Sequence, residues 1–196
     1  VNHDANVDLR LDFVDTYARI ADTLTMTQDA RDINFAGRVD RNTNRLEGEV
    51  GTLLGDFGVG ILGRWHARVY GEEIPSWQDL NEFTLGFFGR WTGNADYALL
   101  CEYDLLRREY RDAVLNDSTT HTLLVGIEGH PLEDLDYLLK IGCAKLNAED
   151  NGLLDDDSDL ITMVMEAEVR LALHNDVAAR IWYVQRPEYA SFSNYQ

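Results

Sequence analysis

Residues 46 to 70 read LEGEVGTLLGDFGVGILGRWHARVY, and this stretch is where the choice between two fold classes is made. Taken three or four apart, its apolar residues fit one face of a helix, namely Leu46, Val50, Leu53, Leu54, Phe57, Ile61 and Trp65. From Phe57 onward the apolar residues also alternate with their neighbours, as in a strand. Glycines weaken both interpretations. For this stretch the choice between helix and strand stays open, and the remainder of the chain reads mostly as helix.

Toward the N-terminus, an apolar stripe with spacings of four, four, three and four predicts an amphipathic helix. Its members are Leu9, Phe13, Tyr17, Ile20 and Leu24, and most of the nearby aspartates lie off this stripe. The polar segment from Thr25 to Arg45 has few apolar residues. It fits either a loop or a solvent-facing helix, and its structure stays open.

Toward the C-terminus, four helix-start signals precede apolar periodic runs. Pro75-Ser76 with Asp79 predicts a helix through Trp91, and Asn94 predicts another toward Leu115. His130-Pro131 places a proline at a first helical position. The acidic cluster 155–159 precedes a run that reaches Ile181, and Arg186-Pro187 ends it.

These signals together predict an all-α protein, a helical bundle of about five to six helices. Residues 1–186 form a single helical domain in this interpretation, and residues 187–196 form a short extended C-terminal arm. No run of 18 apolar residues is present, so no membrane partner is expected. The start of the chain, Val1-Asn2-His3-Asp4, does not read as a secretion signal.

The charge of the chain is strongly acidic, with 35 acidic against 17 basic residues and a net charge of -18. Asp outnumbers Glu by 22 to 13, and Arg outnumbers Lys by 15 to 2. Short carboxylates with few lysines resemble the composition of proteins from salt-in halophiles. The alternative is a nucleic-acid mimic whose carboxylates stand in for phosphates, although mimicry does not require the loss of lysine.

One pattern occurs twice in the chain, at an offset of 26 residues. DFGVGILGRW at 56–65 aligns with EFTLGFFGRW at 82–91. Two similarly packed helix segments are the simpler explanation of the repeat. The alternative is a duplicated contact surface. In the second case Arg64, Trp65, Arg90 and Trp91 bind a partner, because Trp and Arg are enriched among interface hot spots.

No catalytic residue, metal site or cofactor is predicted. Gly58-Val59-Gly60-Ile61-Leu62-Gly63 matches the dinucleotide-binding pattern, but the strand, helix and distal acid that this chemistry needs are absent around it. The five histidines show no metal-ligand spacing, and Cys101 and Cys143 form no recognisable pair. Residues Asn147 to Ser158 resemble a calcium loop that lacks its first Asp and last Glu, and cation binding there stays open.

The acid-capped stretch from Asp155 to Leu171 resembles a helix of the head-to-tail connector (adaptor) proteins of tailed viruses. The resemblance implies a small helical subunit of a ring that grips a portal with a terminal arm. Three aromatic residues of the arm are then partner-binding, namely Tyr189, Phe192 and Tyr195.

The sequence therefore predicts a structural virion protein of a haloarchaeal tailed virus, a homo-oligomer that binds a portal or tail component. It is expected in the virion, after assembly in the cytoplasm of a high-salt host, and nucleic acid is not an expected direct ligand. The alternatives are a halophilic helical enzyme or regulator with an unrecognised site, and an acidic DNA mimic. In the main prediction, the protein is not an enzyme.

Overall fold

The computed structural model describes residues 3–30, 38–71, 79–93, 96–111, 117–132, 134–149, 159–174 and 177–185. Every regular element in this part of the chain is a β-strand. The ten strands are β1 (His3–Asp12), β2 (Thr16–Ala30), β3 (Arg38–Leu54), β4 (Phe57–Tyr70), β5 (Leu80–Thr92), β6 (Tyr97–Tyr110), β7 (Ser118–Leu132), β8 (Leu135–Ala148), β9 (Leu160–His174) and β10 (Val177–Gln185). The described residues include no helix that is long and apolar enough to cross a membrane.

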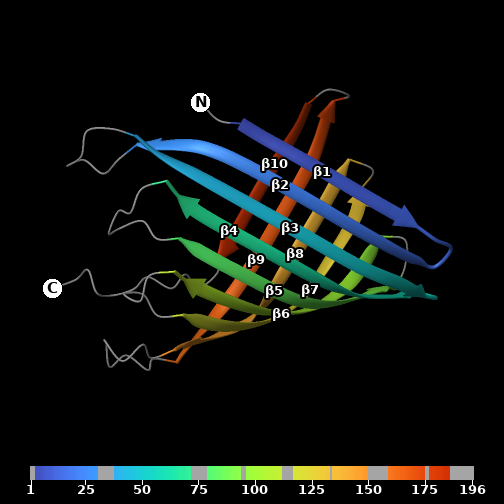
Figure 1. Ribbon diagram of the computed structural model, residues 1–196. Coiled ribbons are helices and arrows are strands. Elements are labelled where there is room, and N and C mark those ends of the chain that lie inside the picture. Colours follow the sequence, from blue (N-terminus) through green and yellow to red (C-terminus); the bar gives the residue numbers. More distant parts are fainter. Residues whose placement is uncertain are drawn as a thin grey trace.

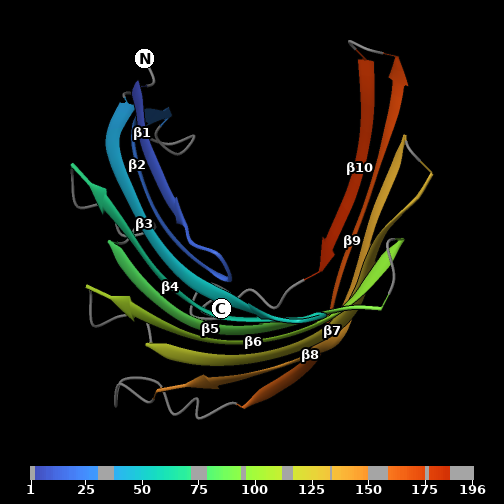
Figure 2. The same ribbon diagram turned by 90° about the vertical axis from the view of Figure 1, so that its right-hand side faces the viewer.

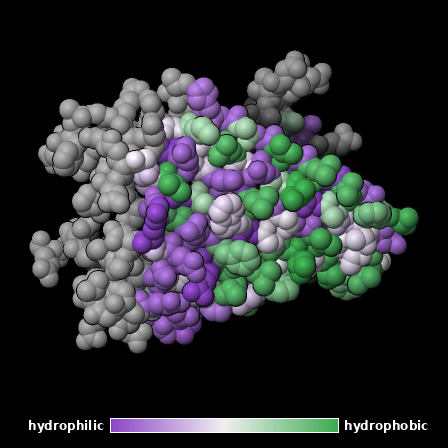
Figure 3. Space-filling view, in the orientation of Figure 1, coloured by the Kyte–Doolittle hydropathy of each residue, from purple (hydrophilic) through white to green (hydrophobic). Residues whose placement is uncertain are grey.

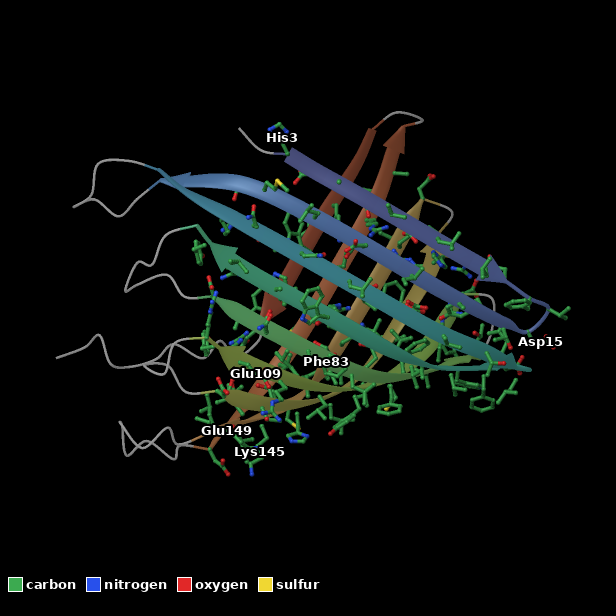
Figure 4. The ribbon with its side chains drawn as sticks, viewed as in Figure 1. His3, Asp15, Phe83, Glu109, Lys145 and Glu149 are labelled. Carbon is green, nitrogen blue, oxygen red and sulfur yellow. The ribbon has the colours of Figure 1, made fainter. Side chains whose placement is uncertain are left out.

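The strands form one antiparallel sheet in which each strand pairs with its neighbours in the sequence, in the order β1 to β10 (Figure 1). Because the chain runs up and down, its connections fall alternately on the two ends of the strands. Those at one end are short, at 13–15, 55–56, 93–96, 133–134 and 175–176. Those at the other end are longer, at 31–37, 71–79, 111–117 and 149–159. Figure 4 shows Asp15 and Glu149, one from each group, at opposite ends of the sheet.

The turn between β3 and β4 shows how a short connection is encoded. Gly55 has a φ of 64°, whereas no non-glycine residue of the described chain has a positive φ. A positive φ at the first central residue alone is the signature of a type II′ turn, which matches the twist of the two strands it joins. Leu54 and Phe57 are direct partners across this turn.

The sheet is bent into an open trough, with β1 and β10 at its two rims (Figure 2). Two long-range ion pairs identify the side chains that point into the trough. Arg90 of β5 contacts Glu128 of β7, and Lys140 of β8 contacts Glu102 of β6, so each pair passes over an intervening strand. Such reach is available on the concave face, where side chains converge. The three residues of the buried apolar cluster lie on this same face, namely Leu124, Ala144 and Val164.

The prediction of an all-α helical bundle is wrong, and the reason lies in the spacing of the apolar residues. A spacing of four returns a side chain to the same face of a helix, and also to the same face of a strand, because four is a multiple of two. The runs Phe57, Ile61, Trp65 and Phe83, Phe87, Trp91 have this spacing. They lie on strands β4 and β5.

The other helix predictions are also wrong. The predicted first helix corresponds to β1, a turn and β2, and the long helix predicted to reach Ile181 corresponds to β9 and part of β10. The open segment from Thr25 to Arg45 belongs in part to β2 and β3. The start signals at 75–76, at 94 and at 155–158 lie outside the described residues, as does the predicted C-terminal arm 187–196.

Candidate functional site: a charged wall on the concave face

The concave face carries most of the charged side chains of the strands. Strand alternation places every second residue there, and cross-strand partners share that face. Its row Arg45, His66, Glu82, Arg108 runs across four neighbouring strands, β3 to β6. We call the charged side chains of this face the charged wall; its basic and acidic groups lie side by side, with apolar residues such as Leu124 between them.

Near the long connections, one carboxylate organises two basic side chains from neighbouring strands. Glu82 Oε2 lies 2.7 Å from His66 Nδ1, and Glu82 Oε1 lies 2.6 Å from an Arg108 guanidinium nitrogen. The side chains of these three residues are only 17–21% exposed. This cluster, defined as Glu82, His66 and Arg108, links β4, β5 and β6 through side chains as well as through the backbone.

A second carboxylate cluster lies beside the first, on β2 to β4. Glu47 accepts a hydrogen bond from Arg64 at 2.9 Å and from Arg45 at 3.0 Å, and Arg19 lies 3.5 Å away. Arg19 in turn contacts Asp8 of β1 at 2.7 Å. These pairs form a ladder from the rim strand into the centre of the sheet.

Toward the short turns, the pairs cross intervening strands. Arg90 Nε donates to Glu128 at 2.5 Å, and Lys140 Nζ donates to both carboxylate oxygens of Glu102 at 2.7 and 2.8 Å. Glu166 of β9 lies 3.7 Å from the same Lys140 ammonium group. The wall is thus internally neutralised, because its cations and anions face one another.

The convex face has the opposite character. Over six central strands its residues are 57–65, 83–91, 97–105, 123–129, 135–143 and 163–171, taking every second position, and none of these is charged. We call this set the apolar band. Its side chains include Ile61, Phe87, Val125 and Ile141, each about half exposed.

More hydrophobic side chains are exposed than buried in this sheet, and most of the exposed ones lie on the convex face. In the described chain, 33 large hydrophobic side chains are exposed, while eight hydrophobic residues are buried. Hydrophobic residues gather on the visible surface toward the short turns, and hydrophilic residues gather toward the opposite end (Figure 3). The sheet is therefore apolar outside and charged inside, the reverse of a water-soluble domain.

Aromatic residues mark both edges of the apolar band. Trp65 and Phe83 are cross-strand partners near the long connections. Phe57 and Trp91 are partners near the short turns, with ring centroids 6.4 Å apart. Tyr137 lies close to that second edge, on β8.

This arrangement gives the duplicated Arg-Trp pattern a structural meaning. Its two copies lie on antiparallel neighbours, so Trp65 and Trp91 reach opposite edges of the band. Arg64 and Arg90, one residue earlier, point to the concave face and bind Glu47 and Glu128. The structure brings each Arg into the charged wall and separates the two tryptophans, so the four residues do not form one surface.

The remaining sequence candidates fall elsewhere. The dinucleotide-like glycines 58–63 lie within strand β4, without the helix that phosphate binding needs. Tyr189, Phe192 and Tyr195 lie outside the described residues, as does most of the calcium-like loop. Cys101 and Cys143 are free and exposed. No group of three potential metal ligands occurs within the described ranges.

Sequence reasoning missed the residues that build the charged wall, above all Glu82, Glu102, Arg108 and Lys140. A usable signal was present in the run from 97 to 108, where charged and apolar residues partly alternate, as in Cys101, Glu102, Tyr103, Asp104 and Leu105.

The acidic excess is not spread over the sheet. The ten strands contain 16 acidic and 14 basic residues, whereas the rest of the chain contains 19 acidic and 3 basic ones. Residues 149–159 alone contribute six acids. The sheet itself is therefore nearly balanced in charge, and the acidic composition that we read as halophilic comes mainly from residues outside the strands.

These features define a class of protein: an antiparallel β-meander, curved into a trough, with an apolar outer face and a charged inner face. Comparison with solved structures finds the same fold in OmpT of Vibrio cholerae, an outer membrane protein. The in-vitro folded form is 12% identical with a TM-score of 0.59, and the outer-membrane expressed form is 13% identical with a TM-score of 0.59. In both cases the match covers 93% of this chain and 56% of OmpT.

The chain thus spans little more than half the length of the solved proteins that it resembles. No protein-family model matches the sequence. No curated protein matches it either. The similarity establishes the fold.

The prediction of a helical head-tail connector in a virion is wrong. The part of the connector-like stretch that the structure describes forms strand β9, in a sheet similar to that of an outer membrane protein. The predicted virion partners, such as a portal or tail component, and the location in a virion or a high-salt cytoplasm, are wrong with it. The expectation of no membrane partner loses its basis, because it counted consecutive apolar residues, and in this sheet, which resembles that of an outer membrane protein, they occupy alternate positions.

Proposed function

We propose that this chain forms a membrane-spanning wall of an outer-membrane pore. The apolar band faces lipid, and the charged wall lines a water-filled passage for small polar solutes. The proposed role is passive passage rather than catalysis. The likeness to OmpT supports the architecture. The proposed role as a pore is supported by the division into an apolar and a charged face.

The height of the apolar band is the observation on which the proposal rests. On β4 the band extends from Phe57 to Trp65. Nine residues of a strand span about 30 Å, which becomes roughly 23 Å along the membrane normal at a tilt of ~40°. Membrane β-barrels present an outer apolar band of about 25 Å between two aromatic girdles. The band and its aromatic edges match both features.

The lengths of the connections between strands also support the proposal and indicate an orientation in the membrane. Barrels of the outer membrane have short turns on the periplasmic side and longer loops on the outside. The five short and four longer connections of this chain are segregated in the same manner. The long connections therefore lie on the external side in this proposal.

The near balance of charge on the inner wall bears on which solutes pass. Charges that neutralise one another generate little net field, so neither cations nor anions are strongly concentrated in the passage. The paired charged groups also keep water along the passage. The proposed passage is consequently weakly selective for charge.

Tryptophan quenching tests the proposal directly. The chain has four tryptophans, at 65, 77, 91 and 182, and variants that retain one of them are made with Phe at the other three. In vesicles, we expect bromine placed near the headgroups to quench Trp65 and Trp91. Trp182, whose cross-strand partner Glu168 lies on the concave face, is expected to respond to aqueous iodide instead.

A matched control places a new tryptophan at the middle of the band. Ile61→Trp, in a background without other tryptophans, is expected to respond to bromine deep in the acyl chains and not to iodide. If Trp65, Trp91 and the residue introduced at position 61 were all quenched by iodide and unaffected by brominated lipid, the convex face would lie in water and the proposal would be wrong.

A further inference from the structure

A recess on the concave face lies near the short-turn end of the sheet. Its volume is about 370 Å³, within the ~300–1,000 Å³ usual for small-molecule sites. Strong curvature brings residues of β1 to β3 and of β6 to β8 around the same space, so the recess is more than a groove between two strands. Its lining combines an apolar floor with a charged rim.

The floor is built from apolar side chains and from glycines. Leu53, Phe88, Leu100 and Leu138 contribute the side chains. Gly60 makes room for the ring of Phe88, because a Cβ at that position would lie 2.2 Å from Phe88 Cζ. The ring of Phe88 therefore lies over Gly60 and contributes an apolar surface to the recess.

The rim carries an accessible pair of opposite charges whose two members both line the recess. Arg90 Nε donates to Glu128 Oε1 at 2.5 Å, and these side chains are 47% and 34% exposed. Arg10, whose guanidinium lies 4.7 Å from the centre of the Tyr17 ring, contributes a further cation that pairs with Asp12. Lys140 is only 13% exposed and is already held by Glu102.

We propose that this recess binds a small zwitterion with an apolar side chain, of the class of leucine and other apolar α-amino acids. The ligand carboxylate binds the Arg90 guanidinium, the ligand ammonium group binds Glu128, and the side chain lies on Phe88, Leu100 and Leu138. The inference rests on the proposed function, since it requires the concave face to be open to water.

Charge balance distinguishes a zwitterion from other ligands. A simple anion that binds Arg90 competes with Glu128 and leaves that carboxylate with a weaker partner, and a simple cation does the same to Arg90. A zwitterion brings one charge of each sign and completes an alternating set of four. A neutral polar solute forms hydrogen bonds in which only the protein partner is ionised, and it adds no charge of its own to the set.

Three probes of nearly equal shape test this inference on the full chain folded in detergent. They are L-leucine, 4-methylpentanoate, which lacks the amino group, and 3-methylbutylamine, which lacks the carboxylate. Binding is measured by calorimetry and by saturation-transfer NMR. We expect leucine to bind at least about tenfold more tightly than either analogue, since each analogue loses one charge-assisted contact.

A charge-neutral double variant localises the site. Arg90→Gln with Glu128→Gln is expected to lower leucine affinity at least about tenfold and to abolish the discrimination among the probes. Arg107→Gln with Glu109→Gln removes an exposed pair at 2.8 Å whose members do not line this recess, and is expected to leave binding unchanged.

Equal affinity for leucine and 4-methylpentanoate in the unaltered chain would overturn the inference in favour of an anion site. Equal loss in both double variants would overturn the assignment to this recess. Salt conductance of vesicles that contain the chain is recorded in parallel. If the vesicles conduct but the chain does not discriminate leucine from its analogues, the inference is rejected and the proposed pore still stands. If the chain neither inserts into vesicles nor conducts, the proposed function itself is rejected.

Discussion

At the scale of single residues, Glu82 is the carboxylate that we expect to contribute most to the stability of the sheet. It satisfies His66 and Arg108 from two neighbouring strands, and its side chain is 17% exposed. A poorly exposed cation that loses its carboxylate is still desolvated, and the lost hydration is then no longer offset by the ion pair. Glu109, by contrast, pairs with Arg107 where both side chains are at least half exposed.

The corresponding prediction compares two isosteric substitutions. Glu82→Gln is expected to lower the free energy of unfolding by ~1–3 kcal/mol, because Arg108 loses its carboxylate. Glu109→Gln is expected to change it by less than ~0.5 kcal/mol, as for an exposed pair. Urea unfolding of both variants in the same detergent measures the difference. Equal effects would mean that the cluster around Glu82 contributes no more than a surface ion pair.

At the scale of elements, glycines allow the aromatic side chains to lie against the concave face of β3 and β4. Gly51 and Gly60 are cross-strand partners. A Cβ at Gly51 would lie 2.6 Å from the Tyr17 ring, and one at Gly60 would lie 2.7 Å from the Val50 carbonyl oxygen. The backbone and the rings occupy the space that side chains take elsewhere, which is one way in which curved sheets form.

The element-scale prediction uses two glycines of the same strand. Gly60→Ala is expected to destabilise the sheet by ~1–3 kcal/mol, because a carbonyl group of β3 and the Phe88 ring must both move. Gly63→Ala places its Cβ where no atom lies within 4 Å, and is expected to be neutral or stabilising by up to ~1 kcal/mol. Thermal unfolding compares them. A neutral Gly60→Ala would show that close packing over β4 does not constrain the strand.

At the scale of the whole molecule, the position of the apolar surface decides which solvent the sheet needs. In water, the exposed band would be an aggregation-prone surface. In lipid it is the favourable outer face, and the backbone polar groups of an edge strand become the costly feature. β1 and β10 are the two edges of the described sheet, so a pore of this design requires both to be paired in the membrane.

The whole-molecule prediction depends on depth in the membrane. Ile61→Arg lies at the middle of the band on β4, and is expected to destabilise the folded chain in vesicles by ~2–4 kcal/mol. Val69→Arg lies on the same face beyond the band, and the expected cost is ~0–1 kcal/mol. Both positions are similarly exposed, at 49% and 44%, so an aqueous convex face would give two small and equal effects. Unfolding by guanidinium in vesicles separates the two outcomes.

The sequence by itself determined the alternation that places Ile61 and Arg64 on opposite faces of a strand, and it contained the Gly55 turn and the duplicated Arg-Trp pattern. It did not determine which period to read, because spacings of four satisfy helix and strand alike. It also invited the assumption that apolar residues point inward. In the proposed pore that assumption fails, because lipid is the outer solvent, and no local pattern states which solvent a face will meet.

Only the tertiary structure decided that Arg90 meets Glu128 and that Lys140 meets Glu102. These partners are 38 residues apart and lie on strands separated by another strand. Their contact depends on how far the sheet curves, which is the sum of small twists and glycine positions over many strands. The pattern along each strand is local and can be read from the sequence, whereas the curvature is collective and brings the charged wall and its recess together.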